Sequence, residues 1–125
     1  MPNISSDVLD AALNDIISTT ENLYITDDTA EPTTFAQAAT TYKLATKATP
    51  SFTGPAAGDT SGRKLTVDAI TDGSVGTTGT AAYWALTDDS NSELLAAGPL
   101  SGTQSVTSGN TFTLTAFDIE FPDPA

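Results

Sequence analysis

The sequence predicts a mainly β protein, a compact antiparallel β-sandwich or barrel with one N-terminal amphipathic helix. Three observations support this fold class. Twenty-three of the 125 residues are threonine, a β-branched residue that favours strands. Residues 63–121 contain short stretches of alternating apolar and polar residues, separated by turn residues at regular spacing. Clear helical periodicity occurs only near the N-terminus.

The helix is predicted over residues 6–18. Its apolar residues follow the spacing of one helical face: Val8, Leu9, Ala12, Leu13, Ile16 and Ile17. Ser5 or Ser6 can cap this helix, and Asp7 suits the positive end of its dipole. The apolar face can pack on the protein's own sheet or on a neighbouring subunit, and packing within the chain is the favoured interpretation.

The segment after the helix is rich in turns. Thr34 followed by Gln37 is a capping-box pattern, which predicts one or two helical turns. The expected elements in chain order are a strand at 23–26, a turn-rich stretch at 27–34, the helical turns at 35–41, short strands or extended loop at 42–46 and 51–53, and a Gly- and Ser-containing loop at 54–62.

From residue 63 onward the pattern is that of a β protein. The expected elements are a strand at 63–70 closed by a turn at 71–74, a strand at 80–87 joined by residues 88–92 to a partner at 93–97, and a hairpin of 104–107 with 111–121. In the last strand the apolar phase slips by one residue near Ala116, which indicates either a β-bulge or a strand that changes its packing partner.

The length of 125 residues suits one domain. We therefore expect a single domain over residues 1–125. It would consist of an N-terminal helix at 1–20, a turn-rich segment with short strands at 21–62, and a β core at 63–125.

The net charge of −12 is the strongest global signal. A chain this acidic repels phosphate backbones and anionic lipid, so neither nucleic acid nor a membrane surface is an expected partner. The acidity fits a solvated surface, which is the favoured interpretation, or docking onto a basic partner. We also find neither a secretion signal nor a membrane span, so we expect synthesis and folding in the cytoplasm.

The residue types needed for common catalysis are missing. The chain has no histidine and no cysteine, which removes the usual bases, nucleophiles and zinc ligands. Asp118 and Glu120 point to one side of a strand, but glycoside hydrolysis also needs a cleft that so small a chain hardly provides. We expect no enzyme and no cofactor.

Three smaller features have a structural and a functional interpretation. Acidic residues of the turn 88–92 have calcium-binding atoms, but their spacing matches no known calcium loop, so a solvated turn is favoured. Trp84 alternates with apolar neighbours, which favours the core over an exposed contact. Arg63 and Lys64 can form salt bridges to a partner, but both open a strand, where basic residues more often protect a sheet edge, and this second interpretation is favoured.

Several stretches resemble a family of short virion structural proteins of tailed bacteriophages and prophages. They are VLDAALN (8–14), AEPTT (30–34), GRKLTVDAITDG (62–73), YWALTDDSNSELL (83–95) and SVTSGNTFTLTAFDIEFPDP (105–124). Together they span nearly the whole chain. The resemblance implies a non-enzymatic virion protein, either a capsid decoration (cement) protein or a tail or fibre component, and it brings no catalytic residues.

A place on the capsid exterior fits the composition best, because packaged DNA would repel an acidic chain. The expected partners are the major capsid protein and further copies of the chain. Three-fold lattice sites would accommodate a trimer, but the sequence carries no trimer signature and does not define the oligomeric state. The alternative is a tail or fibre module facing a host receptor. By exclusion of the β core, the contacts are expected from the helix, the loop 27–34 or the loop 53–63. The candidate interface residues are Val8, Leu9, Leu13, Asp27, Asp28, Glu31, Arg63 and Lys64.

Overall fold

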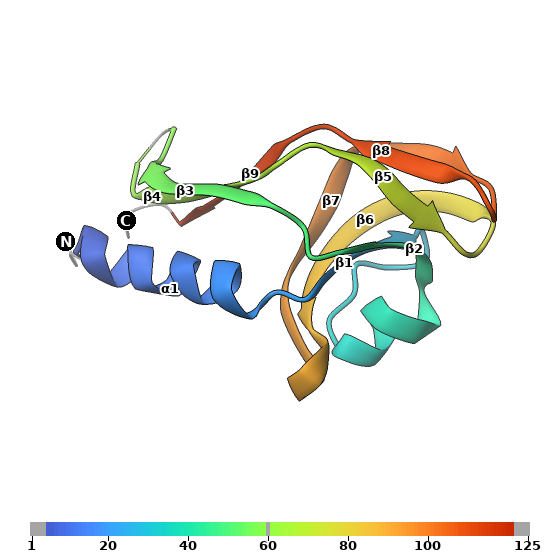
Figure 1. Ribbon diagram of the computed structural model, residues 1–125, viewed down its shortest axis with the longest axis horizontal. Coiled ribbons are helices and arrows are strands. Elements are labelled where there is room, and N and C mark those ends of the chain that lie inside the picture. Colours follow the sequence, from blue (N-terminus) through green and yellow to red (C-terminus); the bar gives the residue numbers. More distant parts are fainter. Residues whose placement is uncertain (1–4, 60, 122–125) are drawn as a thin grey trace. The chain divides into compact units, whose positions relative to one another are not determined.

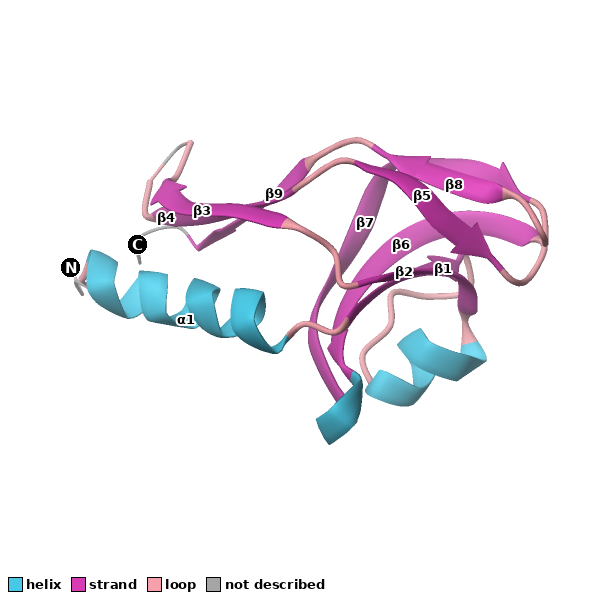
Figure 2. Ribbon diagram, viewed as in Figure 1, coloured by secondary structure: helices cyan, strands magenta, loops and turns pink. Residues whose placement is uncertain are grey.

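The computed structural model describes residues 5–59 and 61–121, which belong to two compact units. Unit 1 comprises 1–19, 51–69 and 115–125, and unit 2 comprises 20–50 and 70–114. Neither unit is continuous in sequence, because the chain passes from one to the other four times. The sheets are antiparallel and the long helix lies at the N-terminus (Figure 2), so the expected fold class is confirmed.

Unit 1 consists of a helix packed on a three-stranded sheet. The helix is α1 (Ser6–Thr19), and the sheet has the order β3 (Phe52–Ala57), β4 (Arg63–Val67) and β9 (Phe117–Phe121). The helix contacts β4 and β3 (Figure 1). Leu9, Leu13 and Ile16 are its buried residues, so the predicted helix and its packing within the chain are both confirmed.

The strand register divides this sheet into an apolar and a polar face. Opposite Cα positions pair Leu65 with Ile119 and Val67 with Phe117 on one face, and Lys64 with Glu120 and Thr66 with Asp118 on the other. Side chains alternate between the faces of a strand, which explains the separation. The apolar face supplies the core of unit 1, and the polar face carries its hydrogen-bonded charges.

Unit 2 is a six-stranded sheet that curls into a half-barrel (Figure 1). Its strands, in spatial order, are β7 (Glu93–Val106), β6 (Gly79–Asp88), β1 (Asn22–Asp27), β2 (Lys43–Ala48), β5 (Ile70–Val75) and β8 (Thr111–Leu114). The predicted strand 23–26 and the pairing of 80–87 with 93–97 are confirmed. So are the helical turns at 35–41, which include η1 (Gln37–Thr41).

The core of unit 2 uses both faces of its central strands. Leu23 and Ile25 are fully buried on one face of β1, and Tyr24 is buried on the other. On the Tyr24 face, Ala38 of η1 and Ala85 of β6 form a small apolar cluster with it. Because η1 covers this face, β1 is buried on both sides and its sequence lacks the usual alternation.

Two aromatic rings lie directly over glycines of a neighbouring strand. A Cβ on Gly98 would lie 2.8 Å from the Trp84 ring, and one on Gly73 would lie 1.9 Å from the Phe112 ring. Both aromatic residues are buried, which confirms Trp84 as a core residue. Glycine is required at these two positions because the rings occupy the space of a side chain.

The predicted strand 63–70 and turn 71–74 were wrong in their boundaries. Residues 63–67 form β4 of unit 1, and 70–75 form β5 of unit 2. The turn-like composition of 71–74 has another cause. Thr71 and Asp72 form a bulge where the β5–β8 register shifts, and Gly73 makes room for Phe112.

The predicted hairpin of 104–107 with 111–121 was also wrong. Strand β7 pairs with β6, and β8 pairs with β5, so the two lie at opposite ends of the sheet order. Of the two explanations for the phase slip near Ala116, the change of partner is confirmed. Residues 111–114 belong to β8 in unit 2, whereas 117–121 form β9 in unit 1.

The predicted loop 54–62 is shorter in the structure. Strand β3 continues to Ala57, with a register shift between Thr53 and Ala56 in its pairing with β4. Gly54, with φ of 115°, and Pro55 occupy this irregularity. The sequence looked like a loop because these two residues belong to the irregular part of an edge strand.

Candidate docking surfaces

The helix residues predicted to dock differ in their accessibility. Val8 is 60% exposed, whereas Leu9 and Leu13 are buried in unit 1. Two of the three apolar candidates on α1 therefore contribute to the core, and Val8 is the one that a partner can reach.

The acidic loop after β1 is open to solvent. Asp28 and Glu31 are exposed, and Asp27 is half-buried. The Asp27 carboxylate accepts a hydrogen bond of 2.9 Å from the Thr29 backbone N–H, which shapes the turn. The loop thus presents two carboxylates, those of Asp28 and Glu31, as a small acidic surface on unit 2.

Arg63 connects the sheet of unit 1 to its helix. Its Nε lies 2.7 Å from Asp10 Oδ1, and its Nη2 lies 3.2 Å from Asp10 Oδ2. Such a two-pronged contact suits the planar guanidinium. The prediction that Arg63 and Lys64 protect a sheet edge was wrong, because β4 is the central strand of its sheet. Both residues instead form ion pairs within unit 1.

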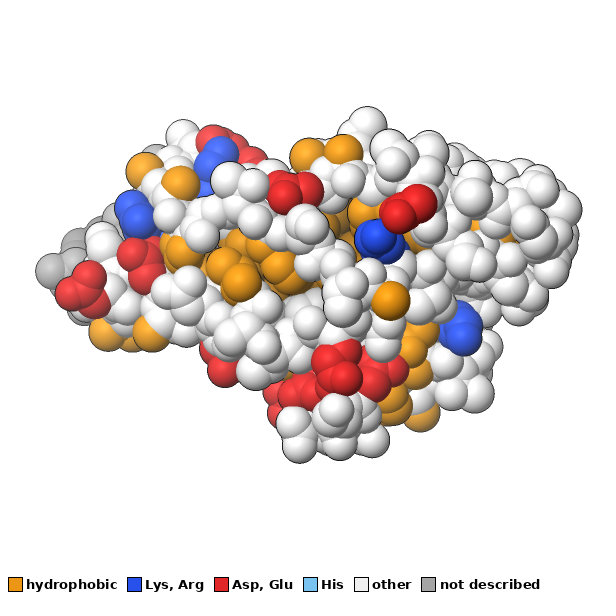
Figure 3. Space-filling model, in the orientation of Figure 1, with side chains coloured by type: hydrophobic (Ala, Val, Ile, Leu, Met, Phe, Trp, Pro, Cys, Tyr) orange, Lys and Arg blue, Asp and Glu red, His pale blue; other side chains and the backbone are white. Residues whose placement is uncertain are grey.

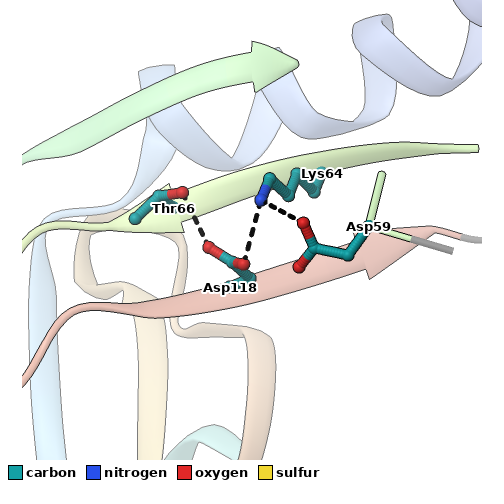
Figure 4. A network of polar contacts seen from close by, with 4 residues as sticks. All are labelled: Asp59, Lys64, Thr66 and Asp118. Carbon is teal, nitrogen blue, oxygen red and sulfur yellow. Dashed lines mark hydrogen bonds and ion pairs between the residues drawn. The ribbon is translucent and has the colours of Figure 1, made fainter. Parts of the chain in front are cut away.

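Lys64 holds together a polar network on the other face of this sheet (Figure 4). Its Nζ lies 2.6 Å from Asp59 Oδ1 and 3.2 Å from Asp118 Oδ2, and the Thr66 hydroxyl donates to Asp118 Oδ1 at 2.7 Å. Hydrogen bonds to Asp59 and Asp118 raise the pKa of Lys64. The Thr66 hydrogen bond, together with Lys64, lowers the pKa of Asp118. The network ties the β3–β4 loop to β9.

Replacing Asp118 with asparagine is expected to weaken the acid sensitivity of unit 1. The folded-state pKa of Asp118 lies below its ordinary value of 3.8, so its stabilising contribution is present above about pH 4 and is lost as the pH falls through the folded-state value. The measurement is the urea midpoint of the helical circular dichroism signal as a function of pH. The exposed control Asp28→Asn is expected to lose urea midpoint with falling pH as steeply as the wild type. If Asp118→Asn behaves in the same way as this control, the result would contradict the role of Asp118.

A second polar cluster lies at the end of β1 and β6 in unit 2. The Tyr24 hydroxyl donates to Asp89 at 2.6 Å, and Thr87 also donates to Asp89. Burial and then the Asp89 contact raise the pKa of Tyr24. Burial acts to raise the pKa of Asp89, but its hydrogen bonds from Thr87 and Tyr24 outweigh this and lower it. The cluster connects η2 (Asp89–Asn91) to β1.

The carboxylates suggested for calcium have protein partners. Asp88 caps η2 by accepting hydrogen bonds from the backbone N–H and the side-chain amide of Asn91, which lower its pKa, the amide contributing most. Glu21 accepts a hydrogen bond of 2.7 Å from the Ser90 N–H. Within residues 5–59 and 61–121, no group of three or more acidic side chains is arranged to hold a metal ion.

All four basic side chains of the chain are engaged inside their own unit. Besides Arg63 and Lys64, Lys47 forms an ion pair of 2.9 Å with Asp72, and Lys43 lies 5.6 Å from the centre of the Tyr24 ring. Acidic side chains remain in excess on the surface and gather near η2 (Figure 3). The accessible charge of both units is therefore negative.

A continuous run without charge is a further feature of the sequence that was not among the predicted docking surfaces. Residues 94–117 contain no Asp, Glu, Lys or Arg, although the chain has 20 such residues in 125. In the structure this run forms most of β7, the following turn and β8, and so includes both edges of the six-stranded sheet. A simple scan for charge spacing would have found it.

In the part of the chain that the structure describes, no helix is long and apolar enough to cross a membrane. Comparisons with protein-family models, with curated proteins and with solved structures find no match to this chain.

Proposed function

We propose that the chain is a non-enzymatic structural protein of a tailed-bacteriophage particle that decorates the outside of the capsid by binding the major capsid protein lattice. The observation that carries this proposal is the distribution of charge. Lys47, Arg63 and Lys64 form ion pairs within their own units, and Lys43 lies over the Tyr24 ring. Among the described residues, the exposed carboxylates outside these ion pairs are those of Asp7, Asp15, Asp28, Glu31 and Glu93. Such a surface is repelled by packaged DNA and suits the solvent side of a head.

The family resemblance of the sequence supports a virion role, and the polar clusters support the absence of catalysis. A glycosidase acid needs a raised pKa, whereas the pKa of Asp118 is lowered by Thr66 and Lys64. Asp118 therefore stays ionised and serves the sheet rather than a substrate. The turn carboxylates Asp88 and Asp89 likewise serve as a cap and as a partner of Tyr24.

The acidic loop of unit 2 is the best-placed of the candidate docking surfaces. Asp28 and Glu31 are exposed, and neither is an acceptor in the ion pairs of Lys47, Arg63 and Lys64. A capsid surface with basic residues would attract this loop, and the attraction would weaken with added salt. Val8 offers a small apolar contact on unit 1.

Immunogold labelling of particles produced by the host that carries the coding sequence tests the proposal. Gold spread over the head is the expected result. Gold confined to the tail or its tip would overturn decoration and would support the alternative, a tail or fibre module. Particles without gold, from a lysate that contains the protein, would overturn both virion roles.

The docking surface is tested with purified heads that lack the protein. Asp28→Lys is expected to reduce head binding at low salt, because it reverses one charge of the acidic loop. Glu93→Lys is the matched control, since it makes the same charge change at another exposed position of unit 2. Equal binding by the two variants would remove the acidic loop from the interface.

A further inference from the structure

The edges of the two sheets are protected to different degrees. An edge strand presents unpaired N–H and C=O groups, and proteins protect such edges with charged residues, proline or bulges. In the described part of the chain, the edge strands are β3 and β9 in unit 1, and β7 and β8 in unit 2.

Three of these edges carry a protecting feature. Strand β9 has the carboxylates of Asp118 and Glu120. Strand β3 contains Pro55 and an irregular register. Strand β7 contains Pro99, and its register against β6 shifts twice. Each feature makes the addition of a further strand unfavourable.

Strand β8 has none of these features. It consists of Thr111, Phe112, Thr113 and Leu114, and the irregularity of its pairing lies in β5. Residues 111–117 (TFTLTAF) contain no charge, proline or glycine and have high β-propensity, the composition of segments that pair readily between chains. A hollow of about 180 Å³ adjoins β8 and is lined by residues 104–107 and 110–113.

The backbone of β8 is oriented for such pairing. The Val75 N–H donates to the Asn110 carbonyl, which therefore faces β5. In a strand, the backbone N–H and C=O groups of alternate residues point in the same direction. The backbone groups of Phe112 therefore also point toward β5, and the backbone groups of Thr111 and Thr113 point toward the free edge. The side chains of both threonines are exposed.

We propose that β8 pairs with β8 of a second copy of this chain, antiparallel and about a two-fold axis. The distribution of charge along the chain indicates that the partner of β8 is a second copy of this chain. Two chains of −12 repel each other wherever acidic residues meet, and the charge-free run 94–117 removes this repulsion at β8. The end of unit 2 with the β5–β6 and β7–β8 turns is free of charged side chains on the face shown in Figure 3. A basic partner would dock on the acidic surfaces instead.

This contact is separate from head binding and stands whether or not the capsid is the destination. A two-fold pairing uses the same strand on both copies, so it closes as a dimer and does not propagate. It also covers the one unprotected edge found among the described strands.

Sedimentation velocity of the full chain over a range of concentrations tests the pairing. The wild type is expected to sediment as a dimer. Thr113→Asp is expected to be monomeric, because it places carboxylates in a strand pair that has none. The control Thr103→Asp adds the same charge at an exposed position of β7 and is expected to stay dimeric. Circular dichroism checks that each variant is folded.

A charge-swap experiment identifies the interface directly. Thr113→Lys alone is expected to dimerise less than the wild type, and an equal mixture of Thr113→Lys with Thr113→Asp is expected to form a mixed dimer. A wild type that stays monomeric or forms a trimer overturns the proposal. So does a dimer that Thr113→Asp leaves intact. None of these results depends on where the protein lies in a particle, so this proposal and the decoration proposal fail independently.

Discussion

Gly73→Ala is expected to destabilise unit 2 by about 2–4 kcal/mol. The new Cβ would lie 1.9 Å from the Phe112 ring, closer than any real contact, and Phe112 is only 3% exposed. The ring must therefore leave its buried position, or β5 and β8 must separate. Urea unfolding followed by the fluorescence of Trp84, the single tryptophan, measures the change in unit 2.

Gly76→Ala is the matched control for this variant. A Cβ on Gly76 would have no atom within 4 Å, so its substitution is expected to change the free energy of unfolding by less than about 1 kcal/mol. If the two variants unfold at the same urea concentration, the Phe112 ring does not occupy the space above Gly73. The same result would remove the explanation given for the turn-like sequence of β5.

Leu13→Ala is expected to destabilise unit 1 by about 2–5 kcal/mol. Leu13 is fully buried on the face of α1 that packs on the sheet, and the truncation leaves a cavity there. The helical circular dichroism signal measures the effect, because α1 is the longest helix of the described chain. Trp84 fluorescence, which reports on unit 2, provides a second signal in the same samples.

Val8→Ala separates a structural role of α1 from a docking role. Val8 is 60% exposed, so its truncation is expected to change stability by less than about 0.5 kcal/mol. A Leu13→Ala variant as stable as Val8→Ala would show that the helix is not held by its buried face. With stability accounted for, any loss of head binding in Val8→Ala would reflect contact with a partner.

Elements defined by neighbouring residues could be predicted from the sequence. The periodicity of residues 6–18 specifies α1, because a helix forms its backbone bonds within its own segment. The β6–β7 hairpin could also be predicted, since two stretches of alternating apolar and polar residues flank one short turn. The burial of Trp84 followed from its apolar neighbours.

The partners of strands that no short turn joins could not be predicted, because alternation reports which face a side chain occupies and not which strand lies beside it. The sequence predicted one strand followed by a turn for residues 63–74 and one continuous strand for residues 111–121. In the structure, each stretch is divided between the two units. The partners of the basic residues are equally distant. Arg63 meets Asp10 from 53 positions away, and Lys64 meets Asp118 from 54 positions away.

The mainly β fold class, the N-terminal helix, the acidic net charge and the charge-free run 94–117 follow from the amino-acid sequence alone. That this run forms the two edges of a sheet, and that β8 is the edge without protection, follows from the strand pairing in the folded chain. The physical reason is that composition and periodicity are local properties of the chain. An edge, in contrast, is defined by the absence of a neighbouring strand, which depends on how all the described strands pair.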